Sequence, residues 1–124
     1  MSESNTEGWV TLRRVAQILK AKVLASEDYL DREVQHVECT DLMSQVLAFV
    51  QPGYLLLTGL TNIQVVNTAN ISGLIGVVFV RGRPPAMEAI AKAKAVELPL
   101  LLTSYSMYEA AGRLYMNGLP GSSD

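Results

Sequence analysis

Residues 55–62 read LLLTGLTN, an apolar run that ends on small polar residues, and this stretch decides how the chain is expected to fold. The run is short, rich in leucine and bounded by a turn signal, so it predicts a strand that is buried on both faces. A strand of this kind belongs to a parallel sheet covered by helices, because neither of its faces has to meet water. After Glu33, short apolar runs of this kind alternate with segments that have the periodicity of a helix. The sequence therefore predicts an α/β fold.

The expected elements follow one another at a spacing of about 20 to 25 residues, the length of a strand and helix unit. The predicted strands are VQHVE (34–38), YLLLT (54–58), GVVFV (76–80) and LPLLLT (98–103). The predicted helices are LMSQVLAFV (42–50), NIQVVNTANIS (62–72), AMEAIAKAKAVE (86–97) and SMYEAAGRLYMNG (106–118), preceded by a first helix, TLRRVAQILKA (11–21), behind an N-cap at Thr11. We expect a three-layer sandwich whose mostly parallel sheet has four to five strands and helices on both faces. Whether KVLA (22–25) pairs with this sheet or covers its edge is left open.

Length and composition limit the classes of protein to consider. The 124 residues fit one domain, for which we expect a flexible N-terminus at 1–8, the α/β domain at 9–119 and a flexible tail at 120–124. No apolar run approaches the ~20 residues that cross a bilayer, and the start has no basic and apolar leader, so a cytoplasmic protein without membrane contact is expected. Because the net charge is −2 and no Lys/Arg cluster is present, nucleic acid is not an expected partner. One cysteine and one histidine predict no metal and no other cofactor.

Polar residues follow each predicted strand at the edge where ligands of open α/β folds bind. The candidate ligand-binding residues are Thr58, Gly59, Thr61, Asn62, Arg81, Gly82, Arg83, Thr103 and Ser104. Hydroxyls, an amide, two guanidinium groups and the free N–H groups of helix starts are suited to a small anion. The alternative is that these residues only cap helices and close turns, which requires the same residue types. The two arginines either clamp a phosphate or carboxylate or solvate their loop.

Catalytic residues are not evident in the sequence. His36 lies inside a predicted strand, where a partly buried structural histidine is the ordinary case. Cys39 is three positions further along and points to the opposite face of an extended strand, so the two do not form a nucleophile and base pair. We therefore expect a protein that is not an enzyme.

The last predicted helix has more large apolar side chains than a single core-facing stripe needs. Tyr105, Met107, Tyr108, Tyr115 and Met116 are the candidate interface residues. Tyr and Met are favoured in the cores of interfaces, which predicts a homodimer, whereas the alternative is that these side chains cover the sheet.

Five blocks together resemble the DRTGG domain family: ILKAKVLASEDYLDREV, DLMSQVLAFV, LLLTGLTNIQVVNTA, GVVFVRGRPP and LPLLLTSYSMYEAAGRLYMNGL. The resemblance covers about residues 10–119 and implies a fold similar to the N-terminal domain of HPr kinase/phosphorylase. The chain does not contain the string DRTGG; its nearest pieces are DRE (31–33) and TGLTN (58–62). What the resemblance implies is a non-catalytic regulatory module that supports dimer contacts. Stand-alone members occur near iron-only hydrogenase genes, which implies a partner enzyme of redox metabolism.

Three functions are consistent with these observations. The leading hypothesis is a homodimeric regulatory or scaffolding domain that binds a phosphate-like or nucleotide-like anion at the carboxyl edge of its parallel sheet. The second is an interaction module without a ligand, and the third is an enzyme acting on a phosphorylated or acyl-phosphate metabolite.

Overall fold

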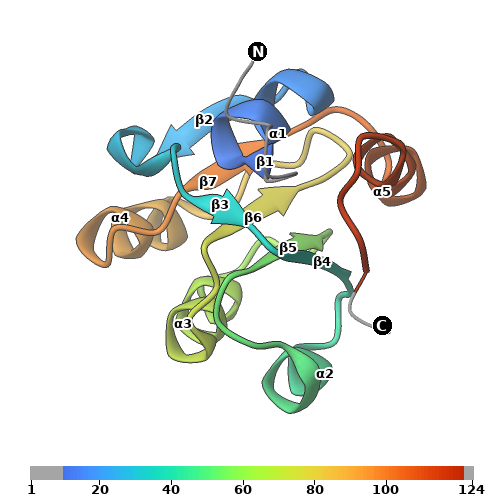
Figure 1. Cartoon of the computed structure of the whole chain (residues 1–124). Coiled ribbons are helices and arrows are strands. Elements are labelled where there is room, and N and C mark those ends of the chain that lie inside the picture. The colour runs from blue at the N-terminus through green and yellow to red at the C-terminus, as the bar shows by residue number, and fades with distance from the viewer. Residues whose placement is uncertain (1–9, 122–124) are drawn as a thin grey trace.

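The computed structural model describes residues 10–121. Figure 1 shows a layered molecule in which helices cover both faces of one central sheet. In chain order the elements are β1 (Val10–Thr11), α1 (Leu12–Leu19), β2 (Lys22–Ala25), the 3-10 turn η2 (Glu27–Tyr29), β3 (Glu33–Val34), β4 (His36–Cys39), α2 (Met43–Phe49), β5 (Tyr54–Thr58), α3 (Ile63–Ser72), β6 (Gly76–Phe79), α4 (Met87–Ala95), β7 (Leu100–Leu102) and α5 (Met107–Met116).

The central sheet has five strands in the order β2-β7-β6-β5-β4. The last four are parallel and neighbour one another in chain order, so that His36 pairs with Tyr54, Leu55 with Gly76 and Val77 with Leu100. β2 adds to the β7 edge in the antiparallel sense, which settles the place of KVLA. The predicted α/β class, with a mostly parallel sheet of four to five strands between helices, is confirmed.

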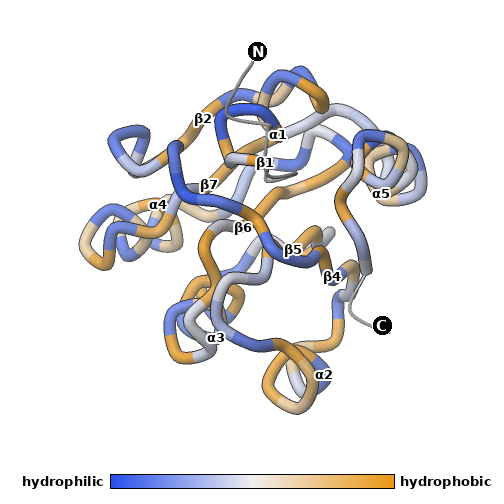
Figure 2. The backbone as a smooth tube through the Cα atoms, viewed as in Figure 1, coloured by the Kyte–Doolittle hydropathy of each residue, from blue (hydrophilic) through white to orange (hydrophobic). Residues whose placement is uncertain are grey.

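Two separate cores lie on the two faces of the sheet. α2, α3 and α4 cover one face, where Val46, Val66 and Ala89 pack with the sheet residues Leu56 and Phe79. On the other face, α1 and α5 pack on residues such as Leu57 and Leu101. The strands β5 and β6 are buried on both sides and lie in the hydrophobic interior of the hydropathy-coloured trace (Figure 2). This agrees with the continuous apolar runs of a doubly covered sheet.

The predicted strand 34–38 is interrupted at Gln35. Val34 pairs with Val10 in a separate two-stranded sheet, and β4 begins only at His36. The break lets Val34 turn its side chain into the core beneath β1 and α1. Periodicity alone could not show this division, because both halves are extended.

The chain end lies beside the exposed side of β4. The N–H of Val37 donates to the carbonyl of Pro120 at 3.1 Å, and Gly121 forms a parallel bridge with Val37. The expected tail at 120–124 therefore begins with two residues that contact the sheet, and its remainder lies outside the described residues, as does the expected flexible segment 1–8. Between residues 10 and 121 no helix is long and apolar enough to cross a membrane.

Candidate functional site at the carboxyl edge of the sheet

At the end of β5, the polar residues of the stretch LLLTGLTN bind a carboxylate of the protein itself. The hydroxyl of Thr58, which is 0% exposed, donates to Oδ1 of Asp41 at 2.9 Å. The N–H of Gly59 donates to the same oxygen at 2.7 Å. Asp41 follows β4, so it holds together the ends of two neighbouring strands. The donors expected to bind an external anion at Thr58 and Gly59 are thus already used by an internal one.

Further along this loop, Asn62 bonds to the start of α3, and Thr61 bonds to the residue before α4. Asn62 is the N-cap of α3, and its side-chain oxygen accepts from the N–H of Gln64 at 3.0 Å. The carbonyl of Thr61 accepts from the N–H of Ala86 at 2.9 Å. The capping alternative therefore holds for Asn62, while the hydroxyl of Thr61 has no hydrogen bond within residues 10–121.

The loop after β6 turns back sharply and bonds to the loop after β7. Arg81 and Gly82 both have left-handed backbones, with φ of 63° and 68°, and the N–H of Arg83 points to the carbonyl of Val80 at 3.4 Å. Two successive left-handed residues are characteristic of a tight type I′ turn. The N–H groups of Arg81 and Gly82 donate to the carbonyls of Tyr105 and Thr103, both at 2.8 Å.

Thr103, which directly follows β7, has a structural role. Its buried hydroxyl donates to the carbonyl of Leu19 at 2.8 Å and accepts from the N–H of Tyr105 at 3.3 Å. This bond fixes the C-terminus of α1 to the sheet. Ser104 is exposed beside Gly82, and its hydroxyl has no partner in the described part of the chain.

The polar groups that remain free gather around the start of α4. The exposed guanidinium groups of Arg81 and Arg83 make no hydrogen bond or ion pair in the described range. α4 begins at Met87 behind Ala86, whose side chain cannot cap the helix, and Glu88 is an acidic residue of its first turn. The N–H of Ala89 donates to the carbonyl of Ala86 at 3.0 Å, which leaves the N–H groups of Met87 and Glu88 open to solvent. α4 lies on one face of the sheet, and α5, which follows β7, lies on the other. These groups are suited to an anion.

His36 and Cys39 lie on the edge strand β4, away from this group of donors. Nδ1 of His36 is 3.0 Å from the carbonyl of Gly121, and the ring lies 5.0 Å from that of Tyr54. Burial, reinforced by the neighbouring Glu38 carboxylate, raises the pKa of the Cys39 thiol to about 11. A thiol that stays protonated at neutral pH is a poor nucleophile. No group of three His, Cys, Asp or Glu side chains between residues 10 and 121 is arranged to hold a metal ion.

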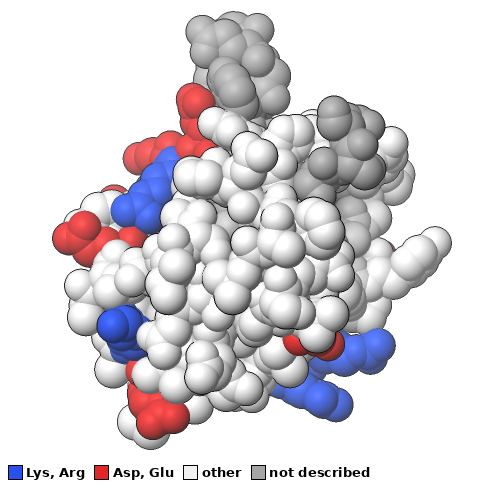
Figure 3. Space-filling view, turned by 90° about the horizontal axis from the view of Figure 1, so that it is seen from below, with Lys and Arg blue, Asp and Glu red and all other residues white. Residues whose placement is uncertain are grey.

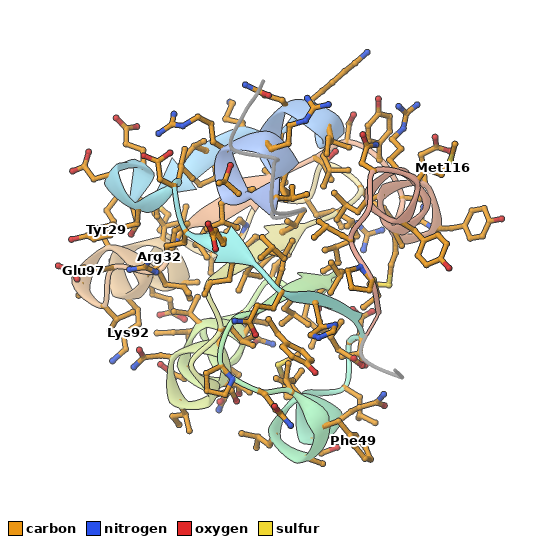
Figure 4. The ribbon with its side chains drawn as sticks, viewed as in Figure 1. Tyr29, Arg32, Phe49, Lys92, Glu97 and Met116 are labelled. Carbon is orange, nitrogen blue, oxygen red and sulfur yellow. The ribbon has the colours of Figure 1, made fainter. Side chains whose placement is uncertain are left out.

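The five interface candidates, of which Tyr105 precedes α5 and the other four lie on it, divide into two groups. Tyr105 and Met107 pack against the core, and the guanidinium of Arg113 lies 4.3 Å from the centre of the Tyr105 ring. Tyr108, Tyr115 and Met116 are exposed, and Met116 stands out from α5 in Figure 4. Beside them an open groove of about 520 Å³ runs between α5 and β4 and includes Val37, Cys39 and Leu119. The sequence reasoning did not find this groove, because its two sides are far apart in the chain.

A second hollow, of about 410 Å³, lies where η2 meets α4. Figure 4 shows Tyr29, Arg32, Lys92 and Glu97 gathered in this region. A hydrogen bond to the Glu97 carboxylate raises the pKa of Tyr29, and Arg32 lies over the Tyr29 ring at 4.7 Å. These contacts fasten η2 to the end of α4.

The comparisons with known proteins agree with this architecture. The family model described as the DRTGG domain matches residues 14–116. The fold is similar to the crystal structure of the CBS and DRTGG domains of the regulatory region of Clostridium perfringens pyrophosphatase, which is complexed with its activator, diadenosine tetraphosphate. The TM-score is 0.72 at 18% identity, over 89% of this chain and 47% of that one, so this chain spans about half the length of the solved chain. No curated protein matches the sequence.

Proposed function

Because the chain belongs to the DRTGG domain family, we propose that it is a regulatory domain that binds a small anionic ligand beside the loop between β6 and α4. The observation that carries this proposal is the pair of guanidinium groups at Arg81 and Arg83, which have no partner among residues 10–121 and precede the start of α4, where no side chain caps the helix. The ligand would contact these two side chains, the Ser104 hydroxyl and the first N–H groups of the helix.

The conformation of Arg81 supports this assignment. A non-glycine residue in the left-handed region costs roughly 1–2 kcal/mol, and such residues are concentrated at functional sites. Here the conformation turns the Arg81 N–H toward the loop after β7. The remaining sequence candidates act as supports: Thr58, Gly59 and Thr103 fix the strand ends, and Asn62 fixes the start of α3.

The chemical class of the ligand is proposed from its charge. Two arginines and a helix start match a phosphate-bearing molecule. The activator in the similar solved structure is a dinucleoside polyphosphate, which makes nucleotide polyphosphates the first compounds to test. The proposal includes no catalysis, since the high pKa of Cys39 removes the one cysteine as a ready nucleophile.

Self-association, a cytoplasmic location and contact with a partner enzyme of redox metabolism are further parts of the proposal. The exposed Tyr108, Tyr115 and Met116 beside the groove of α5 supply a surface for a protein partner. The second candidate function is an interaction module without a ligand. It is favoured by the internal use of Thr58, Gly59, Asn62 and Thr103.

Thermal unfolding in the presence of ATP, diadenosine tetraphosphate, inorganic triphosphate and sulfate tests the site. A ligand at 100 times its Kd stabilises the folded state by about 2.7 kcal/mol, which raises the Tm by several degrees. The double substitution Arg81→Ala with Arg83→Ala should abolish this shift. The matched control is Arg13→Ala with Arg14→Ala, which removes the same charge from the exposed side of α1.

The outcomes separate the two candidate functions. A shift that both double variants retain would remove the β6–α4 loop from the site. The absence of any shift in the wild-type protein, for every compound, would favour the interaction module.

A further inference from the structure

Ser104 lies at the point where the loop after β6 touches the loop after β7. The N–H of Arg81 donates to the carbonyl of Tyr105, and the N–H of Gly82 donates to the carbonyl of Thr103, both at 2.8 Å. These two hydrogen bonds bracket Ser104. A Cβ placed on Gly82 would lie 4.0 Å from the Cα of Ser104 and, its own chain neighbours aside, would meet no other atom of the described chain within 4 Å. Ser104 therefore lies against the middle of the β6–α4 turn, with open space beside it.

The two residues on either side of Gly82 are Arg81 and Arg83, and both are exposed, as is Ser104. Within residues 10–121, neither the two guanidinium groups nor the Ser104 hydroxyl has a hydrogen bond or an ion pair. Each guanidinium has five N–H donors, whereas a neutral hydroxyl accepts at most two hydrogen bonds. The two arginines therefore offer far more donors, and more positive charge, than the unmodified serine can use.

We propose that Ser104 is a phosphorylation site and that its phosphate occupies the anion site of the β6–α4 loop. A protein kinase would transfer the γ-phosphoryl group of ATP to the serine. The Ser104 Oγ forms a bond to the γ-phosphorus, the bond from that phosphorus to the oxygen of the β-phosphate breaks, ADP leaves, and the hydroxyl proton passes to a base of the kinase. The inference rests on the proposed function, because it uses the same two arginines, and it adds a covalent competitor for their ligand.

A phosphate at this position changes the electrostatics of the loop. Phosphoserine carries a charge of about −1.5 to −2 at pH 7 and has three strong acceptor oxygens. Guanidinium groups bind phosphate through paired, charge-assisted hydrogen bonds. Such bonds from Arg81 and Arg83 to phosphorylated Ser104 would fasten the two loops together and would neutralise the positive charge that attracts a free anion. Phosphorylation would therefore stabilise the domain and close the ligand site.

Three of the other serines in the described chain are poorly placed for the same role. Ser26, Ser72 and Ser106 are partly buried. The hydroxyls of Ser26 and Ser106 also hold the backbone: the first donates to a carbonyl of α4, and the second accepts from an N–H of α5. A phosphate on either would break a contact that fixes an element.

Ser44 is the other exposed serine between residues 10 and 121, and it provides a natural comparison. It lies on α2, inside the span 42–80, which contains no Asp, Glu, Lys, Arg or His. Figure 3 views the molecule from the side of α2 and α3, and most of this face is uncharged. A phosphate on Ser44 would have no arginine of its own segment to bind, whereas one on Ser104 would have two.

The first test places phosphoserine at position 104 during synthesis of the full chain and measures thermal unfolding without any ligand. The Tm should rise by several degrees, because new hydrogen bonds join the two loops. In the background of Arg81→Ala with Arg83→Ala, the same phosphoserine should not raise the Tm. An equal change of Tm in both backgrounds would overturn the proposal, because the phosphate would then not bind the arginines.

The second test is calorimetric titration of inorganic triphosphate into the same proteins. Phosphoserine at 104 should weaken triphosphate binding by at least about tenfold, because it takes the donors of the ligand, and phosphoserine at 44 should leave the affinity unchanged. Undiminished binding to the protein phosphorylated at Ser104 would overturn the proposal. If the unmodified protein binds no triphosphate, the proposed ligand site fails, whereas the arginine-dependent rise in Tm still decides the present inference.

Mass spectrometry of the chain isolated from its own cells tests whether the modification occurs. Trypsin cleaves after Lys94 and Arg113, so Ser104 and Ser106 lie on one peptide, 95–113, and fragment ions between them assign the phosphate. Phosphate should be found on Ser104. A peptide without phosphate in growing, starved and stressed cells, or with phosphate on Ser106 alone, would overturn the proposal.

Discussion

Thr58 and Thr103 illustrate which side-chain contacts the sequence could not reveal. Thr58 ends β5 and Thr103 directly follows β7, at the edge expected to bind a ligand. Their hydrogen bonds nevertheless go to Asp41 and to the carbonyl of Leu19, 17 and 84 residues away. Local sequence shows that a hydroxyl is present, but only the fold brings its acceptor near. Arg81 and Arg83 remain candidates because no acceptor in the described part of the chain bonds to their side chains.

The pKa of Cys39 gives a prediction at the residue scale. Burial and the Glu38 carboxylate raise the pKa of this thiol from 9.0 to about 11 in the folded protein. Between these values the unfolded chain loses the thiol proton while the folded chain retains it. This proton contributes stability that is fully present below pH 9 and is lost as the pH rises toward 11.

Urea unfolding of the wild type and of Cys39→Ala at pH 8 and pH 10.5 measures this effect. Because the other titrating groups are common to both proteins, the wild type should lose more free energy of unfolding than the variant. Equal losses would show that the thiol is as accessible to water in the folded chain as in the unfolded one.

The elements themselves were largely predictable, since each combines a local pattern with a local signal. The strand 54–58 was predicted with its exact ends, and the cap expected at Thr11 forms. Asn62 and Ser106 also cap their helices. Strand order, the antiparallel β2 and the break at Gln35 depend on pairing between distant segments. α3 is instructive because its valines, threonine and asparagines are weak helix formers, so its packing and its N-cap carry more of its stability.

Substitution of the α3 cap tests this point. Asn62→Ala removes the acceptor for the N–H of Gln64 and should lower the free energy of unfolding by about 1 kcal/mol. Asn70→Ala, at an exposed position inside the same helix, is the control, and its effect should be neutral or slightly stabilising because alanine is the better helix former. If both substitutions have the same effect in chemical denaturation, the amide of Asn62 does not cap the helix.

On the scale of the whole molecule, the charged residues lie outside residues 42–80. This uncharged segment is visible in the sequence, but the sequence does not distinguish its buried strands from its exposed helices. Only the structure shows that β5 and β6 are enclosed while Leu47, Phe49 and Ile71 are exposed. Phe49 and Ile71 lie where their helices end, at the amino edge of the parallel strands, and Arg81 and Arg83 lie at the carboxyl edge. Phe49 and Ile71 therefore lie at the edge of the sheet opposite to the proposed ligand site.

The two arginines of the proposed ligand site predict a response to salt. Raising NaCl from about 0.1 to about 1 M shortens the screening distance from ~10 to ~3 Å, so the binding of inorganic triphosphate to Arg81 and Arg83 should weaken markedly in calorimetric titrations. An affinity for triphosphate that is the same at both salt concentrations would mean that charged side chains do not hold the ligand.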